Sequence, residues 1–239
     1  MEIKDPQFGS LHEFLINAAH NIHSMDHVFM MEKKNGAYVN ITYGETLKHI
    51  QDWAAYLYSI GIRKGDKLAV VLENCPEFIY FDQALQKLGA VNVSIYPTLT
   101  AEETAFILND SDSKAVLVGN PFLLKKFQKV EQNCPKIQKV FIAFDSVTQS
   151  DKIIHVNDLK KAGEAAWPSV QAELEAILPK IQHDDLAALI YTSGTTGVPK
   201  GTMLSHYNFM SNCYDAIDLC PSINKDDRFL SFLPLSHVY

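Results

Sequence analysis

The chain has 239 residues, enough to bury the core of one large domain or of two small ones. Hydrophobic residues make up 47% and charged residues 21%, which is the composition of an ordinary globular protein. The formal charge of -7, with no run of lysine and arginine, argues against a nucleic-acid-binding surface and against a polybasic membrane patch.

No part of the sequence has the pattern of a signal peptide or of a membrane span. Residues 1–10 lack the apolar centre of a signal peptide, and the longest nearly uncharged stretch, 88–99, is too short and too polar to cross a bilayer. The four cysteines show no CxxC spacing, which favours reduced thiols over a disulfide framework or a zinc site. We therefore expect a cytoplasmic protein that is peripheral to a membrane at most.

Several helix starts are marked by capping boxes, in which a Ser or Thr and a Glu three residues later each satisfy the other's free backbone amide. Behind Thr42 and Asn74, apolar residues recur at helical spacing and predict amphipathic helices. The predicted caps, in chain order, are Ser10 with Glu13, Thr42 with Glu45, Asn74 with Glu77 in a looser form, Thr100 with Glu103, and Ser205.

Short apolar runs lie between these helices and predict strands. The runs are apolar at consecutive positions, which is typical of parallel strands that are covered by helices on both faces. Strands and helices alternate from residue 68 to about 142, and this order predicts the α/β class, with open, mostly parallel sheets covered by helices. The predicted strands are residues 68–72, 90–95, 115–118, 140–143, 186–190 and 229–233.

A more polar stretch, residues 146–183, separates two parts of this pattern. It contains two helix-like segments, at 157–166 and 170–178. We therefore predict a first α/β lobe at residues 1–145, a connecting helical segment at 146–183, and the start of a second α/β lobe at 184–239.

The most informative segment lies between residues 189 and 208. A buried strand is predicted to end at Tyr191, and a stretch rich in Gly, Ser and Thr follows before the next helix. Small residues let backbone amides approach an anion, hydroxyls donate hydrogen bonds, and the single Lys200 adds positive charge. These properties fit a phosphate-binding loop outside the Walker pattern, because Val198 and Pro199 precede the lysine. An ordinary flexible turn has a similar composition, and composition alone favours that alternative.

The full string is more specific than its composition. The run Tyr191-Thr-Ser-Gly-Thr-Thr-Gly-Val-Pro-Lys-Gly201 resembles the signature loop of the AMP-forming, adenylate-forming enzyme superfamily, which includes acyl-CoA synthetases, luciferases and peptide-synthetase adenylation domains. Ile41-Thr-Tyr-Gly-Glu45 and Leu204-Ser-His-Tyr-Asn208 resemble other segments of the same superfamily. Two softer matches, Ile95-Tyr-Pro-Thr-Leu-Thr100 and the string from Leu230 to Tyr239, resemble the long-chain fatty acid–CoA ligase subgroup.

The resemblance implies an enzyme that activates a carboxylic acid, here a long-chain fatty acid, with ATP and then transfers the acyl group to CoA. Lys200 and Thr192 would act in catalysis, Thr192 would be the nearest candidate for a Mg²⁺ contact, and His237 would lie beside the acyl pocket. A packed histidine at a strand end is the alternative for His237. The residues implied to hold the β- and γ-phosphates of ATP are Thr192, Ser193, Gly194, Thr195, Thr196, Gly197 and Lys200.

Later elements of the superfamily's pattern, among them a "Y-G-x-T-E" string, do not occur in this sequence. The sequence-based expectation is therefore an amino-terminal part of a ligase that is inactive by itself, since activation requires the whole set of groups at once. Such a chain should expose apolar surface or a strand edge and self-associate.

Two other functions remain open at this stage. The chain could belong to an enzyme that adenylates another acid, such as an aryl acid or an amino acid. It could also be a short chain that binds a nucleotide or a partner without catalysis.

Overall fold

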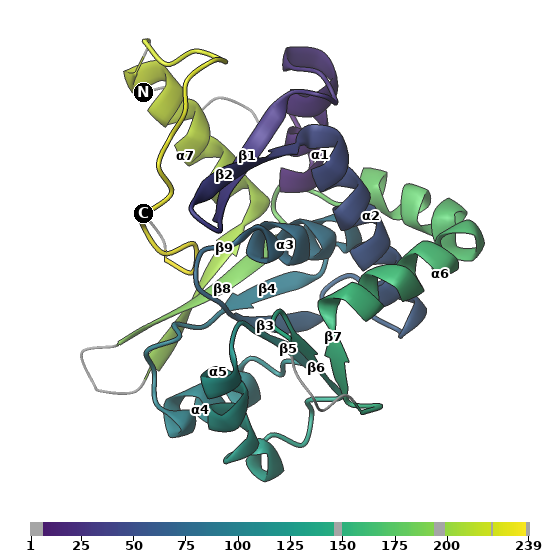
Figure 1. The fold of residues 1–239 in the computed structure, drawn as a ribbon, viewed down its shortest axis with the longest axis vertical. Coiled ribbons are helices and arrows are strands. Elements are labelled where there is room, and N and C mark those ends of the chain that lie inside the picture. The colour runs from purple at the N-terminus through teal and green to yellow at the C-terminus, as the bar shows by residue number, and fades with distance from the viewer. Residues whose placement is uncertain (1–6, 146–149, 194–198, 221, 238–239) are drawn as a thin grey trace.

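The computed structural model describes residues 7–145, 150–193, 199–220 and 222–237. Its centre is a seven-stranded sheet with the strand order β7-β6-β5-β3-β4-β8-β9 (Figure 1). The strands are β3 (Lys67–Val71), β4 (Val91–Ser94), β5 (Ala115–Val118), β6 (Lys139–Ile142), β7 (Ile153–His155), β8 (Leu186–Ser193) and β9 (Pro199–Ser205).

The sheet is mostly parallel, as the sequence predicts. All neighbours from β7 to β8 pair in parallel, and only the last pair, β8 with β9, is antiparallel. The chain passes from β3 to β4 on one side, then returns to the other side of β3 to form β5, β6 and β7. This reversal of direction between β3 and β5 is the topological switch point, where open α/β sheets form ligand-binding crevices.

Each central strand is buried because its side chains alternate between two apolar clusters. In β3, Leu68 and Val70 belong to one cluster, whereas Ala69 and Val71 belong to the other. The first cluster lies under the helices α2 (Tyr43–Ser59), α3 (Pro76–Leu88) and α6 (Val156–Ile177). The second lies under α4 (Ala101–Asp110) and α5 (Pro121–Gln128), on the opposite face of the sheet (Figure 1).

The capping boxes at Thr42 and Thr100 are confirmed, and Ser205 caps α7 (His206–Leu219) through the same arrangement. The Ser10 hydroxyl caps α1 (Leu11–Asn17) by accepting the Glu13 backbone amide. The cap predicted at Asn74 is wrong. Cys75 occupies that position without a side-chain bond, and the Asn74 side chain contacts another segment instead.

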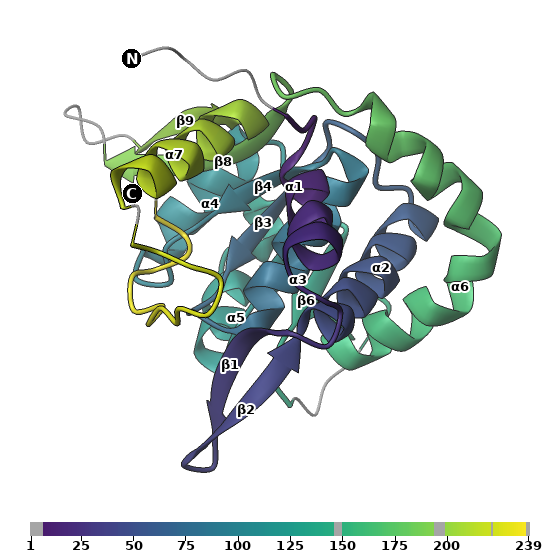
Figure 2. The same ribbon diagram turned by 90° about the horizontal axis from the view of Figure 1, so that it is seen from above.

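Helix α6 is continuous where the sequence predicts two segments, and Pro168 lies inside it. Its long contact with α2 (Figure 2) explains why the helix continues across the proline. At Gly163 the two helices approach so closely that a β-carbon would lie 1.8 Å from the backbone oxygen of Asp52. Tertiary packing therefore outweighs the helix-breaking preference of Pro168.

An antiparallel hairpin, β1 (Val28–Lys34) with β2 (Ala37–Thr42), lies outside the main sheet and is absent from the predicted strands. Asn35 and Gly36 form its turn, with φ angles of 51° and 85°. Asn-Gly is the residue pair that two-residue hairpin turns favour. Short helical turns complete the chain at η1 (Ala18–Ile22), η2 (Glu131–Asn133) and η3 (Leu178–Lys180).

The strand predicted at residues 229–233 is wrong. These residues form no regular element, and Phe229, Leu230 and Phe232 are each more than 70% exposed. No neighbouring strand among the described residues pairs with them, so the apolar run lacks the partner that a strand requires.

The strand β8 lies in the same sheet as β3 to β7, and the division into lobes at residues 145 and 184 stays a prediction.

Candidate functional site

The hairpin of β8 and β9 brings together two residues that the sequence singles out. Thr192 and Lys200 are directly paired across the two antiparallel strands, and both side chains are exposed. The expectation that the strand ends at Tyr191 is wrong, since β8 continues to Ser193 and pairs with a second strand that starts at Pro199. A hydroxyl and an ammonium group therefore stand side by side where the hairpin leaves the sheet.

Of the other predicted phosphate-binding residues, only Ser193 lies within the part of the chain that the structure describes. Ser193 is the last residue of β8, and its backbone pairs with Pro199. The remaining predicted residues lie outside the part of the chain that the structure describes, namely Gly194, Thr195, Thr196 and Gly197.

Tyr191 holds the register of the hairpin through its hydroxyl and its ring. Its hydroxyl donates a hydrogen bond of 2.6 Å to Oδ2 of Asp110, at the end of α4. Its ring lies against Gly201, where a β-carbon would be 3.0 Å from the Tyr191 Cζ atom. Burial and the Asp110 carboxylate both raise the pKa of Tyr191, so the phenol stays protonated and remains a donor.

Side chains from α3 fix the other end of β8. The Gln86 side-chain amide donates to the backbone oxygen of Ala187 at 3.3 Å and to Oδ1 of Asp82 at 3.1 Å. The same Asp82 oxygen accepts a bond of 2.8 Å from Asn92 in β4. This polar network joins α3, β4 and β8, and therefore sets where the hairpin emerges from the sheet.

A cleft of about 420 Å³ opens at the carboxyl ends of β3, β4 and β5. The position coincides with the topological switch point, where ligands bind in open α/β sheets. The Lys126 ammonium donates to the backbone oxygens of Pro97 and Leu99 and thereby ties α5 to the loop after β4. The cleft is lined by Glu73, Pro97, Thr98, Leu99, Thr100, Asn120, Phe122, Leu123 and Lys126.

The remaining predicted site residue, His237, lies near this cleft. Its ring centroid is 5.6 Å from that of Tyr96, which directly precedes the cleft residue Pro97. The side chain of His237 is exposed, which does not fit the alternative of a packed histidine at a strand end. The Asn74 side chain, which sequence analysis assigned to a helix cap, binds residues 231–235 just ahead of His237.

Among residues 7–145, 150–193, 199–220 and 222–237, no group of three or more His, Cys, Asp or Glu side chains is arranged to hold a metal ion. Within the same ranges, no helix combines the length and the apolar character that crossing a membrane would require.

The sequence of this chain matches the family model described as "AMP-binding enzyme" over residues 18–239. The chain belongs to the AMP-binding enzyme family. The match includes the hairpin with Thr192 and Lys200, the cleft at the switch point, and His237.

Curated proteins that are similar in sequence to this chain are named as CoA ligases. The chain is 30% identical over 209 residues to a crotonobetaine/carnitine–CoA ligase of Salmonella arizonae, an alignment that covers 87% of this chain and 39% of that protein. It is 31% identical over 208 residues to the protein of the same name from Escherichia coli, covering 87% and 38%. The chain thus spans less than half the length of the curated relatives that it matches.

Solved structures share the fold of this family member. A long-chain-fatty-acid–CoA ligase from Archaeoglobus fulgidus superposes with a TM-score of 0.75 at 20% identity, covering 99% of this chain and 45% of that one. An acetoacetyl-CoA synthetase from Streptomyces lividans gives a TM-score of 0.76 at 17% identity, covering 95% and 35%. At these identities the likeness concerns the fold alone.

Proposed function

We propose that this protein takes part in the ATP-dependent activation of a carboxylic acid to an acyl-adenylate, with release of pyrophosphate, and in transfer of the acyl group to CoA. The observation that carries the proposal is the direct pairing of Thr192 with Lys200 across the exposed end of the β8–β9 hairpin. Membership of the AMP-binding enzyme family supports the same reaction class.

In this proposal the hairpin binds the phosphates of ATP. The Lys200 ammonium neutralises charge on the β- and γ-phosphates, and the Thr192 hydroxyl donates a hydrogen bond to them. We assign Ser193, Gly194, Thr195, Thr196 and Gly197 to the binding of the same phosphates. Fixed donors of this kind lower the barrier because they stabilise the negative charge of the departing pyrophosphate.

Magnesium enters the proposal as a partner of the phosphates. Mg²⁺ keeps several waters and is commonly held by phosphate oxygens together with a few protein oxygens, so the exposed Thr192 hydroxyl fits as one such oxygen. The ion would neutralise phosphate charge when bound, while Lys200 and Thr192 orient the phosphates.

The acid is proposed to be a long-chain fatty acid. Two segments that resemble the fatty acid–CoA ligase subgroup support this choice, and one of them contains His237, which would border the acid. A short acid with a quaternary ammonium group is the second candidate, because the curated relatives are named as crotonobetaine/carnitine–CoA ligases. A non-catalytic nucleotide-binding role is the outcome if no acid is activated.

The test measures acid-dependent pyrophosphate release with ATP, Mg²⁺ and CoA, using palmitate and carnitine as the acids. It is run on the 239-residue chain and on the product of the complete gene. Lys200→Ala and Thr192→Ala are expected to lower the rate, Lys200→Ala by about a hundredfold or more. Lys161→Ala, which removes an exposed lysine from α6, is the matched control and should retain the rate.

The two acids decide between the candidate substrates. A higher kcat/KM for palmitate supports the fatty acid proposal, and a higher value for carnitine supports the second candidate. An unchanged rate in Lys200→Ala would contradict the role of the hairpin. Absence of release with every acid tested would contradict the proposed reaction.

A further inference from the structure

Asn74 follows the carboxyl end of β3 at the switch point of the sheet, and its side chain binds a segment that is distant in the sequence. The side-chain amide nitrogen donates to the backbone oxygens of Ser231, at 3.1 Å, and of Leu233, at 2.7 Å. The side-chain oxygen accepts the backbone amide of Leu235 at 2.9 Å. A single side chain thus binds backbone groups on both sides of residue 234.

The bound segment, residues 229–237, has no helix or strand of its own. Without a ladder of backbone hydrogen bonds, its position depends on individual contacts such as those of Asn74. The amide of an asparagine carries donors and an acceptor in one plane, so it can bind carbonyl and N–H groups of a neighbouring chain at the same time. Asn74 therefore replaces, at one point, the pairing that a strand would provide.

The same segment contacts two residues that are adjacent in sequence to cleft residues. Glu73, the neighbour of Asn74, lines the cleft, and Pro97, the neighbour of Tyr96, lines it as well. Ser231 of the segment is bound by Asn74, and the ring of His237, at the end of the segment, lies against the ring of Tyr96. The segment is thus attached at two points to residues whose chain neighbours line the cleft.

The chemistry of this border is apolar and aromatic. Phe232 is 72% exposed and Leu233 is 43% exposed, and the ring of His237, in the same segment, lies against that of Tyr96. Such a border suits the hydrocarbon part of an organic acid, whereas polyphosphate binding requires the charge and donors of the hairpin with Lys200.

We propose that Asn74 is a positioning residue for the carboxylic acid, and that it acts by holding residues 231–237 along the edge of the cleft. This inference rests on the proposed function. It assigns to Asn74 no contact with the reacting atoms. Loss of its hydrogen bonds releases the segment and weakens binding of the acid, while ATP binding at the hairpin is left unchanged.

The first test measures the segment itself, independently of any activity. Asn74→Ala removes all of the hydrogen bonds, and Asn74→Asp keeps an acceptor for Leu235 but places a carboxylate oxygen opposite two carbonyl oxygens. Hydrogen exchange of peptides covering residues 229–237 is expected to become at least about tenfold faster in both variants. Exchange in the strands β3 to β6 should remain as in the wild type.

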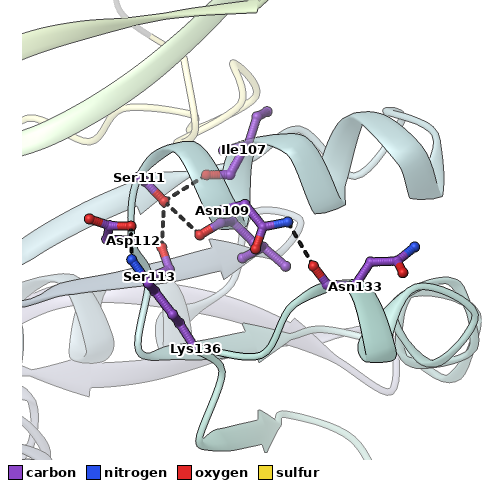
Figure 3. Close-up of polar contacts among 8 residues, drawn as sticks. Ile107, Asn109, Ser111, Asp112, Ser113, Asn133 and Lys136 are labelled. Carbon is purple, nitrogen blue, oxygen red and sulfur yellow. Dashed lines mark hydrogen bonds and ion pairs between the residues drawn. The ribbon is translucent and has the colours of Figure 1, made fainter.

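Asn109→Ala is the matched control. The Asn109 amide also donates to a distant backbone oxygen, that of Asn133, at 2.8 Å (Figure 3). It lies at the end of α4 beside Ser111 and Asp112, and it makes no contact with residues 229–237 that the structure records. This variant should leave exchange in that segment unchanged.

The second test measures kinetics on the product of the complete gene. Asn74→Ala is expected to raise KM for the acid about tenfold, with KM for ATP and kcat within about twofold of the wild type. Accelerated exchange with an unchanged KM for the acid would overturn the positioning role. Unchanged exchange in Asn74→Ala would overturn the inference at its structural step. A wild-type enzyme that activates no acid would instead overturn the proposed function, and the positioning role with it.

Discussion

The interior of the sheet and the rim of the candidate site are stabilised in different ways. The strands β3 to β6 are almost completely buried between two apolar clusters. The rim, formed by Thr192, β9 and residues 229–237, is largely exposed and is positioned by separate polar contacts, those of Asp110 with Tyr191 and of Asn74 with residues 231–235. Burial thus holds the scaffold, whereas a few directed hydrogen bonds position the residues that would meet the substrates.

The largest effect is expected in the interior. Phe141 in β6 is fully buried, and its ring packs against those of Tyr56 and Phe81 at centroid distances of 6.1 and 5.9 Å. Phe141→Ala should lower the free energy of unfolding by about 3–5 kcal/mol, because it removes apolar contacts and leaves a cavity. Chemical denaturation followed by circular dichroism measures this change.

The control for this variant is Phe106→Ala, which makes the same substitution at a side chain that is 37% exposed. It should lower stability by much less. An equal loss of stability in the two variants would contradict the claim that burial is what stabilises the interior of the sheet.

The next effect concerns the seam between α1 and α7, which joins the amino terminus to the hairpin. The Leu11 backbone amide donates to Nδ1 of His206 at 3.2 Å, so this nitrogen must be unprotonated. Burial lowers the pKa of His206 to about 4, with the nearby Asp185 partly opposing the shift and Lys64 adding to it. The neutral imidazole is therefore the form that the folded protein favours.

The sign of the pH dependence follows from the two pKa values. In the unfolded chain the histidine has its usual pKa of about 6.5. Between pH 6.5 and about 4 the unfolded state binds a proton that the folded state excludes, so stability falls as pH falls, by up to about 3 kcal/mol. His206→Gln, which keeps an acceptor but does not titrate, should lose stability less steeply over this pH range. Identical pH profiles would contradict the role of His206.

The sequence predicted the interior well and the rim poorly, for one physical reason. Strands such as 68–72 and 115–118 are apolar at consecutive positions, and a local pattern of this kind decides their structure. Capping boxes at Thr42 and Thr100 are equally local, since both partners lie within three residues.

The contacts of the rim join residues that are far apart in the chain, and no local pattern reports them. Asp110 is 81 residues from Tyr191, and Asn74 is about 160 residues from the segment that it binds. The run at 229–233 has the composition of a strand, yet it has no partner strand among the described residues. The hairpin of β1 and β2 was within reach of the sequence, because Asn35-Gly36 is a recognisable turn signal.

The smallest effect on stability is expected at Tyr191. This variant tests most directly whether a hydrogen bond, and not burial, positions the rim. Tyr191→Phe removes the hydroxyl that donates to Asp110 and keeps the ring that packs against Gly201. The free energy of unfolding should fall by only about 1 kcal/mol, the usual net value of one hydrogen bond. Because Thr192 and Lys200 form the next pair along the hairpin, KM for ATP should rise several-fold, while KM for the acid should stay the same.

Tyr214→Phe is the matched control, because the Tyr214 hydroxyl is buried without a hydrogen-bond partner among the described residues.

Asp110→Asn removes the charge of the carboxylate that accepts the Tyr191 hydrogen bond. Combined with Tyr191→Phe, it should add little to the effect of the single variant. A rise in KM for ATP that is additive in the double variant would mean that the two side chains act separately. In that case packing would position the hairpin, as it does the interior of the sheet, and the hydrogen bond of Tyr191 would not distinguish the rim from the interior.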